Sequence, residues 1–240
     1  MFFFDPAYMV IGLIGMAISF IPQTIVKNTY GKFLKVNTRN NMTGKEVAEA
    51  ILSNSNIKGI SIEAIDGELS DHYDPNSKTV RLSRENYYGT SVSSVSVAAH
   101  EIGHVIQDHV GYQPMKLRAG IVPLVNMTQS LAPMLIMGSL LLRGFLHSVS
   151  PEFYNLIAFI GVLLYGGSVL FHVVTLPVEF NASNRAILAL SNGGFIQSEE
   201  VVGARKVLNA AALTYVATAL YSLIELLYWA WILFGRGRDD

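Results

Sequence analysis

The sequence contains no cysteine, and only 15% of its 240 residues are charged. The absence of cysteine excludes disulfide bonds and thiolate ligands, so any metal site must use histidine and carboxylate side chains. An ordinary soluble domain carries about 25% charged residues. The shortage of charge, together with 51% hydrophobic residues and a mean hydropathy of +0.37, indicates a membrane protein. The net charge of −1 gives no reason to expect binding to nucleic acid.

Four apolar stretches are long enough to cross a bilayer, and they predict a mainly α-helical membrane protein with four transmembrane helices. One helix is expected in residues 1–26, two in 119–176, and the last, followed by a tail, in 207–240. The intervening segments, residues 27–118 and 177–206, are polar. The lipid bilayer is therefore an expected partner.

The distribution of basic residues predicts the orientation of these helices. Residues 27–118 and 177–206 together carry 14 of the 17 Lys and Arg residues. Basic residues close to the ends of transmembrane helices are usually held on the cytoplasmic side. We therefore expect both polar segments at the cytoplasmic face of the membrane, where they can meet.

Residues 100–104 of the first polar segment, HEIGH, match the pattern H-E-x-x-H. In a helix, His100 and His104 lie on one face about one turn apart, so both imidazoles can bind one metal ion. Zinc lowers the pKa of bound water to about 7, and a neighbouring carboxylate can then accept a proton from that water. The pattern predicts His100 and His104 as zinc ligands and Glu101 as the general base.

The same pattern could be an ordinary surface pair of histidines, and chance alone gives it in roughly one chain in a hundred of this length. Its flanks are apolar, with Val97 and Ala98 before it and Val105 and Ile106 after it. The helix is therefore expected to be at least half buried. A buried histidine pair beside a carboxylate is costly unless it is paired or binds metal, which favours the zinc site.

The first polar segment is expected to form a small α+β region of the zincin kind. A capping box of Thr43 and Glu46 predicts a helix. Alternating apolar and polar side chains predict strands at 60–65 and 79–82, with turns between them. The metal helix is expected at Ser91–Val110. An exposed strand beside a metal helix can pair with an extended peptide. A simple two-stranded cover over the helix fits the same pattern.

A catalytic zinc site needs a third protein ligand and one open position. The extended H-E-x-x-H-x-x-G-x-x-H pattern would supply it at residue 110, which is Val110. The expected topology puts Glu152 on the opposite side of the membrane, and Glu199 and Glu200 suit the first turn of the last helix. Glu179, in the second polar segment, remains.

The two stretches VAAHEIGHVIQ and LPVEFNASNRA resemble the YugP-type neutral zinc metallopeptidases, a membrane family with H-E-x-x-H and a downstream E-F-x-A-S. More distantly they resemble the HtpX and CAAX prenyl protease gluzincins, whose downstream motif is E-x-x-x-D. The resemblance covers most of the chain. It implies one zinc ion per chain held by His100, His104 and Glu179, with Glu101 as the catalytic base, in a bacterial inner membrane.

The sequence departs from the distant gluzincins at Ser183, where they place an aspartate that steadies a zinc-bound histidine. A hydroxyl can accept that hydrogen bond but brings no negative charge. Candidates for supporting the zinc ligands, or the oxyanion of the tetrahedral intermediate, are Ser183, Arg185 and Arg205. Further oxyanion candidates are His172, Tyr87 and Tyr88. His72 could bind a second metal ion or form a hydrogen-bonded turn. Glu225 lies inside the last predicted span, where an ionisable group can have a function.

These features favour a membrane-anchored zinc endopeptidase that acts on peptides or membrane proteins at the membrane surface. One alternative is an intramembrane metalloprotease of the site-2 type, but the sequence has no L-D-G motif and the helix from Ser91 is polar for a span. Another is a non-catalytic zinc scaffold that recruits an adaptor or forms a homo-oligomer. The presence of Glu101 argues against a scaffold, because a structural zinc site needs no base.

Overall fold

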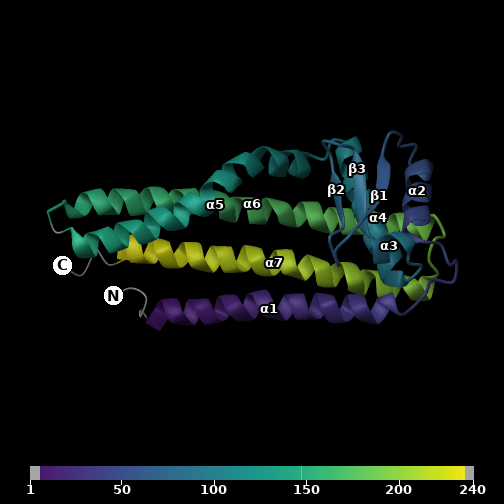
Figure 1. The fold of residues 1–240 in the computed structure, drawn as a ribbon, viewed down its shortest axis with the longest axis horizontal. Coiled ribbons are helices and arrows are strands. Elements are labelled where there is room, and N and C mark those ends of the chain that lie inside the picture. Colours follow the sequence, from purple (N-terminus) through teal and green to yellow (C-terminus); the bar gives the residue numbers. More distant parts are fainter. Residues whose placement is uncertain (1–5, 147, 236–240) are drawn as a thin grey trace. The chain divides into compact units, whose positions relative to one another are not determined.

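The computed structural model describes residues 6–146 and 148–235 and is mainly helical (Figure 1). Residues 1–5 and 236–240, at the ends of the first and last expected segments, lie outside the described residues. The elements are α1 (Pro6–Leu34), α2 (Gly44–Asn54), β1 (Ser61–Ile65), β2 (His72–Asp74), β3 (Thr79–Ser83), α3 (Arg84–Tyr88), α4 (Val92–His109), α5 (Gln113–Phe145), α6 (Pro151–Asn192) and α7 (Ser198–Gly235).

Four of the described helices, α1, α5, α6 and α7, are long and apolar enough to cross a membrane. The predicted fold class is confirmed. The chain divides into two compact units. The first, called the apolar unit, comprises the described parts of Met1–Phe20, Leu117–Thr175 and Tyr215–Asp240, and the second, called the site unit, comprises Ile21–Lys116 and Leu176–Thr214.

Aromatic packing and a side-chain hydrogen bond join helices of the apolar unit. The Tyr8 ring of α1 lies 5.5 Å from that of Tyr228 and 5.4 Å from that of Trp229, both on α7. Between α6 and α7, the Tyr165 hydroxyl donates a hydrogen bond of 2.7 Å to Glu225, so this carboxylate has a protein partner. α5 stays helical through Pro123 and Pro133.

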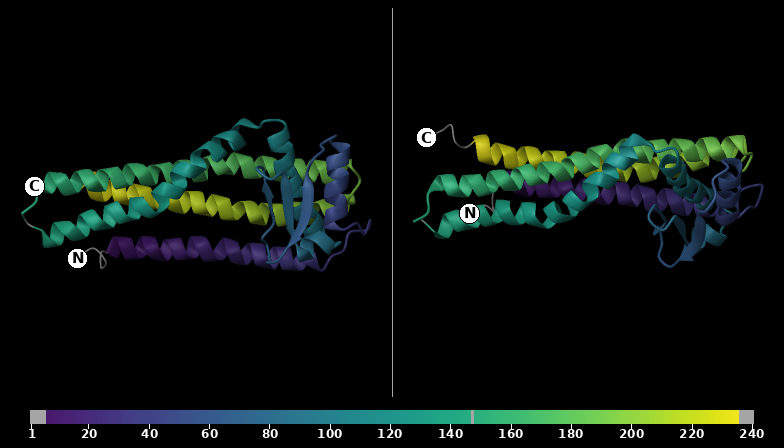
Figure 2. Two further views of the ribbon diagram at one scale, coloured as in Figure 1. Left: turned by 45° about the horizontal axis from the view of Figure 1, so that its top comes forward. Right: turned by 90° about the horizontal axis from the view of Figure 1, so that it is seen from above.

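The site unit contains a three-stranded sheet in the order β1-β3-β2, which packs beside α4 (Figure 2). β1 is parallel to β3 and β2 is antiparallel to it. Both predicted strands are present, but the expectation of turns alone between them is wrong. The Asp71 carboxylate accepts hydrogen bonds from the backbone N–H of Ser83 and from Asn86, and the Tyr73 hydroxyl donates to Asp108 of α4. These contacts hold β2 against β3 and α4.

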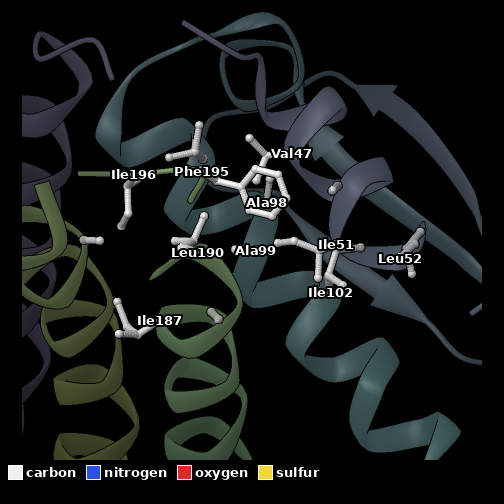
Figure 3. Close-up of a cluster of buried hydrophobic side chains, with 14 of the residues drawn as sticks. Val47, Ile51, Leu52, Ala98, Ala99, Ile102, Ile187, Leu190, Phe195 and Ile196 are labelled. Atoms are coloured by element: carbon white, nitrogen blue, oxygen red, sulfur yellow. The ribbon is translucent and has the colours of Figure 1, made fainter. Parts of the chain in front are cut away.

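The core of the site unit lies between α2, α4 and the end of α6. The capping box of Thr43 and Glu46 is present at the start of α2, and α4 begins after the N-cap Ser91, as expected. Buried side chains of α2 and α4 meet those of α6 and of the α6–α7 loop (Figure 3); they include Val47, Ile51, Leu52, Ala98, Ala99, Ile102, Ile187, Leu190, Phe195 and Ile196.

α6 continues to Asn192, although a span ending before Pro177 was expected. A proline inside a helix removes one backbone hydrogen bond. Beyond it, Val178, Ala182, Ala186 and Leu190 are each fully buried at intervals of four residues. This spacing places them on one helix face, so burial of that face stabilises the continued helix. The consequence is that Glu179 sits on regular helix rather than in a loop.

Candidate metal centre

α4 places His100 and His104 one turn apart, as the spacing predicts, with their ring centroids 4.8 Å apart. Their side chains are only 14% and 11% exposed, and that of Glu179, on α6, is 3% exposed. The Nε2 atoms of both histidines approach the same carboxylate oxygen, Oε2 of Glu179, at 3.3 Å for His100 and 3.6 Å for His104. Two helices far apart in sequence thus bring three metal-binding side chains together.

The geometry and chemistry of this group fit a zinc ion. The three candidate ligand atoms all lie within 4.8 Å of one another. In a tetrahedral zinc site with bonds of about 2.0–2.1 Å, neighbouring ligand atoms lie about 3.3–3.4 Å apart. The two distances to Glu179 agree with that value within a few tenths of an ångström. Two histidines and one carboxylate are also a donor set of catalytic zinc sites, which keep the fourth position open.

Gly103 allows α4 and α6 to approach closely enough for this convergence. A Cβ atom at Gly103 would lie 2.5 Å from the backbone oxygen of Ala182 and 3.1 Å from its Cα. Glu179 precedes Ala182 by three residues and therefore lies on the same face of α6. The variable position before His104 thus has a structural role that the motif pattern does not reveal.

The other ring nitrogen of each histidine also has a polar partner. Nδ1 of His100 lies 3.2 Å from the Ser183 hydroxyl, the side chain expected to replace the aspartate of the distant gluzincins. Nδ1 of His104 lies 3.0 Å from Oε1 of Gln107, a residue that the sequence reasoning missed. Its position in the sequence could have indicated this contact, because a residue three places after His104 lies beside it on a helix.

Glu101 is buried, with 7% of its surface exposed. Burial disfavours the charged carboxylate and raises the pKa of Glu101 above its ordinary value, although the neighbouring His100 and His104 oppose the shift. A carboxylate with a raised pKa is a stronger base near neutral pH than an exposed glutamate. The position next to the first histidine therefore carries a group suited to accept a proton.

The remaining candidates lie in varied surroundings. Arg185 donates through Nε to Oδ1 of Asn181 at 2.7 Å, and Arg205 is exposed on α7. The Nδ1 atom of His72 lies 2.8 Å from the backbone oxygen of Ser70, and His72 is the first residue of β2, so the expected turn at this residue is wrong. Tyr87 and Tyr88 pack against each other with ring centroids 4.7 Å apart, and His172 belongs to the apolar unit.

Sequence comparison identifies the class of protein to which this centre belongs. The chain belongs to the family described as "Putative neutral zinc metallopeptidase", whose model matches residues 8–234. It is 44% identical over 225 residues to the Bacillus subtilis (strain 168) protein named "Putative membrane protease YugP", and the match covers 94% of this chain and 95% of that protein. No solved structure gives a significant match. The resemblance to the YugP-type neutral zinc metallopeptidases is confirmed.

Proposed function

We propose that the protein is a membrane-anchored, zinc-dependent endopeptidase that hydrolyses peptide bonds at the membrane surface. The observation that carries this proposal is the convergence of both Nε2 atoms of the H-E-x-x-H pair on one oxygen of Glu179, at 3.3 and 3.6 Å. Membership of a zinc metallopeptidase family supports it.

In this proposal His100, His104 and Glu179 hold one zinc ion, and Ser183 orients His100 by accepting a hydrogen bond from its Nδ1. When bound, zinc polarises a carbonyl oxygen and lowers the pKa of water to about 7. The three protein ligands leave a fourth position for that chemistry.

Glu101 acts as the general base and then as the general acid. It accepts a proton from the attacking water, whose oxygen forms the new bond to the carbonyl carbon of the scissile peptide. It then donates the proton to the nitrogen as the C–N bond breaks, so that the amine leaves in neutral form. Its burial supports this role, because a raised pKa favours holding the proton between the two steps.

The centre is proposed to lie at the membrane surface. The candidate spans among the described helices are α1, α5, α6 and α7, and α4 does not belong to them. This favours a site at the membrane surface over an intramembrane site of the site-2 type. Residues 27–118 and 177–206 form the catalytic part in this proposal, while the helices of 1–26, 119–176 and 207–240 anchor it. The basic residues of the polar parts support a site on the cytoplasmic face of the membrane, and the Bacillus subtilis relative supports a bacterial inner membrane.

The test is the Glu101→Gln variant of the full chain, purified in detergent. Zinc content should equal that of the native chain, while cleavage of an unfolded protein or membrane-protein substrate falls about 10²- to 10⁴-fold. Glu49→Gln, on an exposed position of α2, is the matched control and should retain activity.

Undiminished cleavage by Glu101→Gln would overturn the assignment of the base. A native chain that binds zinc but cleaves neither unfolded nor membrane proteins would instead favour the non-catalytic scaffold.

A further inference from the structure

Gln107 is fully buried on α4, one turn beyond His104, and connects that histidine to α6. Its Oε1 lies 3.0 Å from Nδ1 of His104. Its Nε2 donates to the backbone oxygen of Val178 at 2.8 Å and to Oδ1 of Asn181 at 3.0 Å. Both hydrogens of the amide and its oxygen therefore have partners within the protein.

The partners on α6 determine which way the Gln107 amide points. A backbone oxygen can only accept hydrogen bonds, so the NH₂ group of Gln107 must face Val178 and its oxygen must face His104. Nδ1 of His104 must then carry the proton, because an amide oxygen cannot donate. A neutral imidazole protonated at Nδ1 has a bare Nε2, and that atom faces Glu179.

A hydrogen bond between Arg185 and Asn181 supports the same orientation of the Gln107 amide. Oδ1 of Asn181 also accepts a hydrogen bond from Nε of Arg185, at 2.7 Å. An arginine side chain has donors only, so it holds the oxygen of the Asn181 amide toward the NH₂ group of Gln107. Arg185 thus has a structural role in this chain of hydrogen bonds.

Ser183, the polar partner of His100, does not fix the tautomer of that histidine. Nδ1 of His100 lies 3.2 Å from the Ser183 hydroxyl, which can either donate or accept. The hydroxyl adapts to whichever tautomer His100 adopts, whereas Gln107 permits only one tautomer of neutral His104.

We propose that Gln107 is a positioning residue that holds His104 in the tautomer with Nε2 free to bind metal, and that ties this imidazole to the backbone of α6 immediately before Glu179. The proposal rests on the proposed zinc site. In this proposal Gln107, which lies outside the H-E-x-x-H pattern, aligns His104 on α4 with Glu179 on α6.

The test compares zinc affinities of full-length variants in detergent, measured by competition with a chromophoric chelator. Gln107→Met keeps the size of the side chain but accepts no strong hydrogen bond, and it should bind zinc about 10- to 100-fold more weakly. Gln107→Glu should recover most of the affinity, because a neutral carboxyl can accept from His104 and donate to Val178. Asn86→Leu, which also removes a fully buried amide of the site unit, should leave zinc affinity unchanged.

Thermal unfolding of the metal-free variants separates loss of fold from loss of alignment. Native zinc affinity in Gln107→Met, with zinc lost in His104→Ala, would overturn the role of Gln107 and leave the proposed function standing. Absence of zinc from the native chain would overturn the proposed function itself. If Gln107→Met does not fold, Gln107→Glu decides: an affinity close to native supports the role, and a tenfold or larger loss refutes it.

Discussion

Gly103→Ala tests whether the contact between α4 and α6 sets the geometry of the metal centre. The added Cβ would lie 2.5 Å from the backbone oxygen of Ala182, while ordinary contact begins at about 3.4 Å, so the helices would have to separate by roughly 0.9 Å. Backbone atoms cannot rotate away as a side chain would. The displacement would move Glu179 away from His100 and His104, lengthening distances that now stand at 3.3 and 3.6 Å.

Two opposing free energies determine the effect of Gly103→Ala on stability. Replacing glycine by alanine inside a helix gains about 0.5–1 kcal/mol, whereas overpacking a buried contact costs about 1–3 kcal/mol. We expect net destabilisation of up to about 2.5 kcal/mol. We also expect a loss of activity on the order of 100-fold, because a 1 Å displacement in an active site can have that effect.

The assay combines thermal unfolding of the metal-free chain with zinc affinity and peptide cleavage. Gly31→Ala is the matched control, because Gly31 also lies within a helix of the site unit and a Cβ there meets nothing within 4 Å. That variant should be slightly stabilised and should keep native zinc affinity. If Gly103→Ala behaved like the control, close approach at this position could not be what aligns Glu179.

Three further predictions follow from the site unit. Ser183→Asp places a carboxylate beside Nδ1 of His100 and should tighten zinc binding about tenfold by chelator competition; weaker binding would contradict the orienting role. Because burial raises the pKa of Glu101 above 4.5 and a general base must be deprotonated, kcat/KM should fall as the pH falls through a value above 4.5 while zinc stays bound; activity constant to pH 4.5 would refute this. Asp71→Ala leaves the backbone N–H of Ser83 without its acceptor and should lower the free energy of unfolding by about 1–3 kcal/mol at unchanged zinc affinity, as denaturant titration would show.

The features predicted well from the sequence are local ones. The limits of α4 follow from the Ser91 cap and from Gly111, whose φ of +66° ends the helix. The start of α2 follows from its capping box, and the four apolar helices follow from hydropathy. Helical periodicity alone places His100 and His104 on one face. Each of these depends only on the residues of one helix and its caps.

The features that escaped prediction depend on contacts between distant parts of the chain. β2 is held by Asp71 and Tyr73, whose partners lie 12 and 35 residues away. The orientation of the Gln107 amide depends on the Val178 carbonyl, 71 residues further on. α6 runs through Pro177 because its buried face packs in the core of the site unit, which no local rule anticipates. Glu179 could be anticipated because topology and family resemblance both carry long-range information.

The most direct test of the three-ligand zinc centre is the zinc content per chain of the detergent-purified protein, measured for the native sequence and for Glu179→Ala. Glu199→Ala, which removes an exposed carboxylate of the same unit, is the control. We predict about one zinc per chain in the native and control proteins and a sharp loss in Glu179→Ala. Zinc retained without Glu179, or absent from the native chain, would contradict this centre.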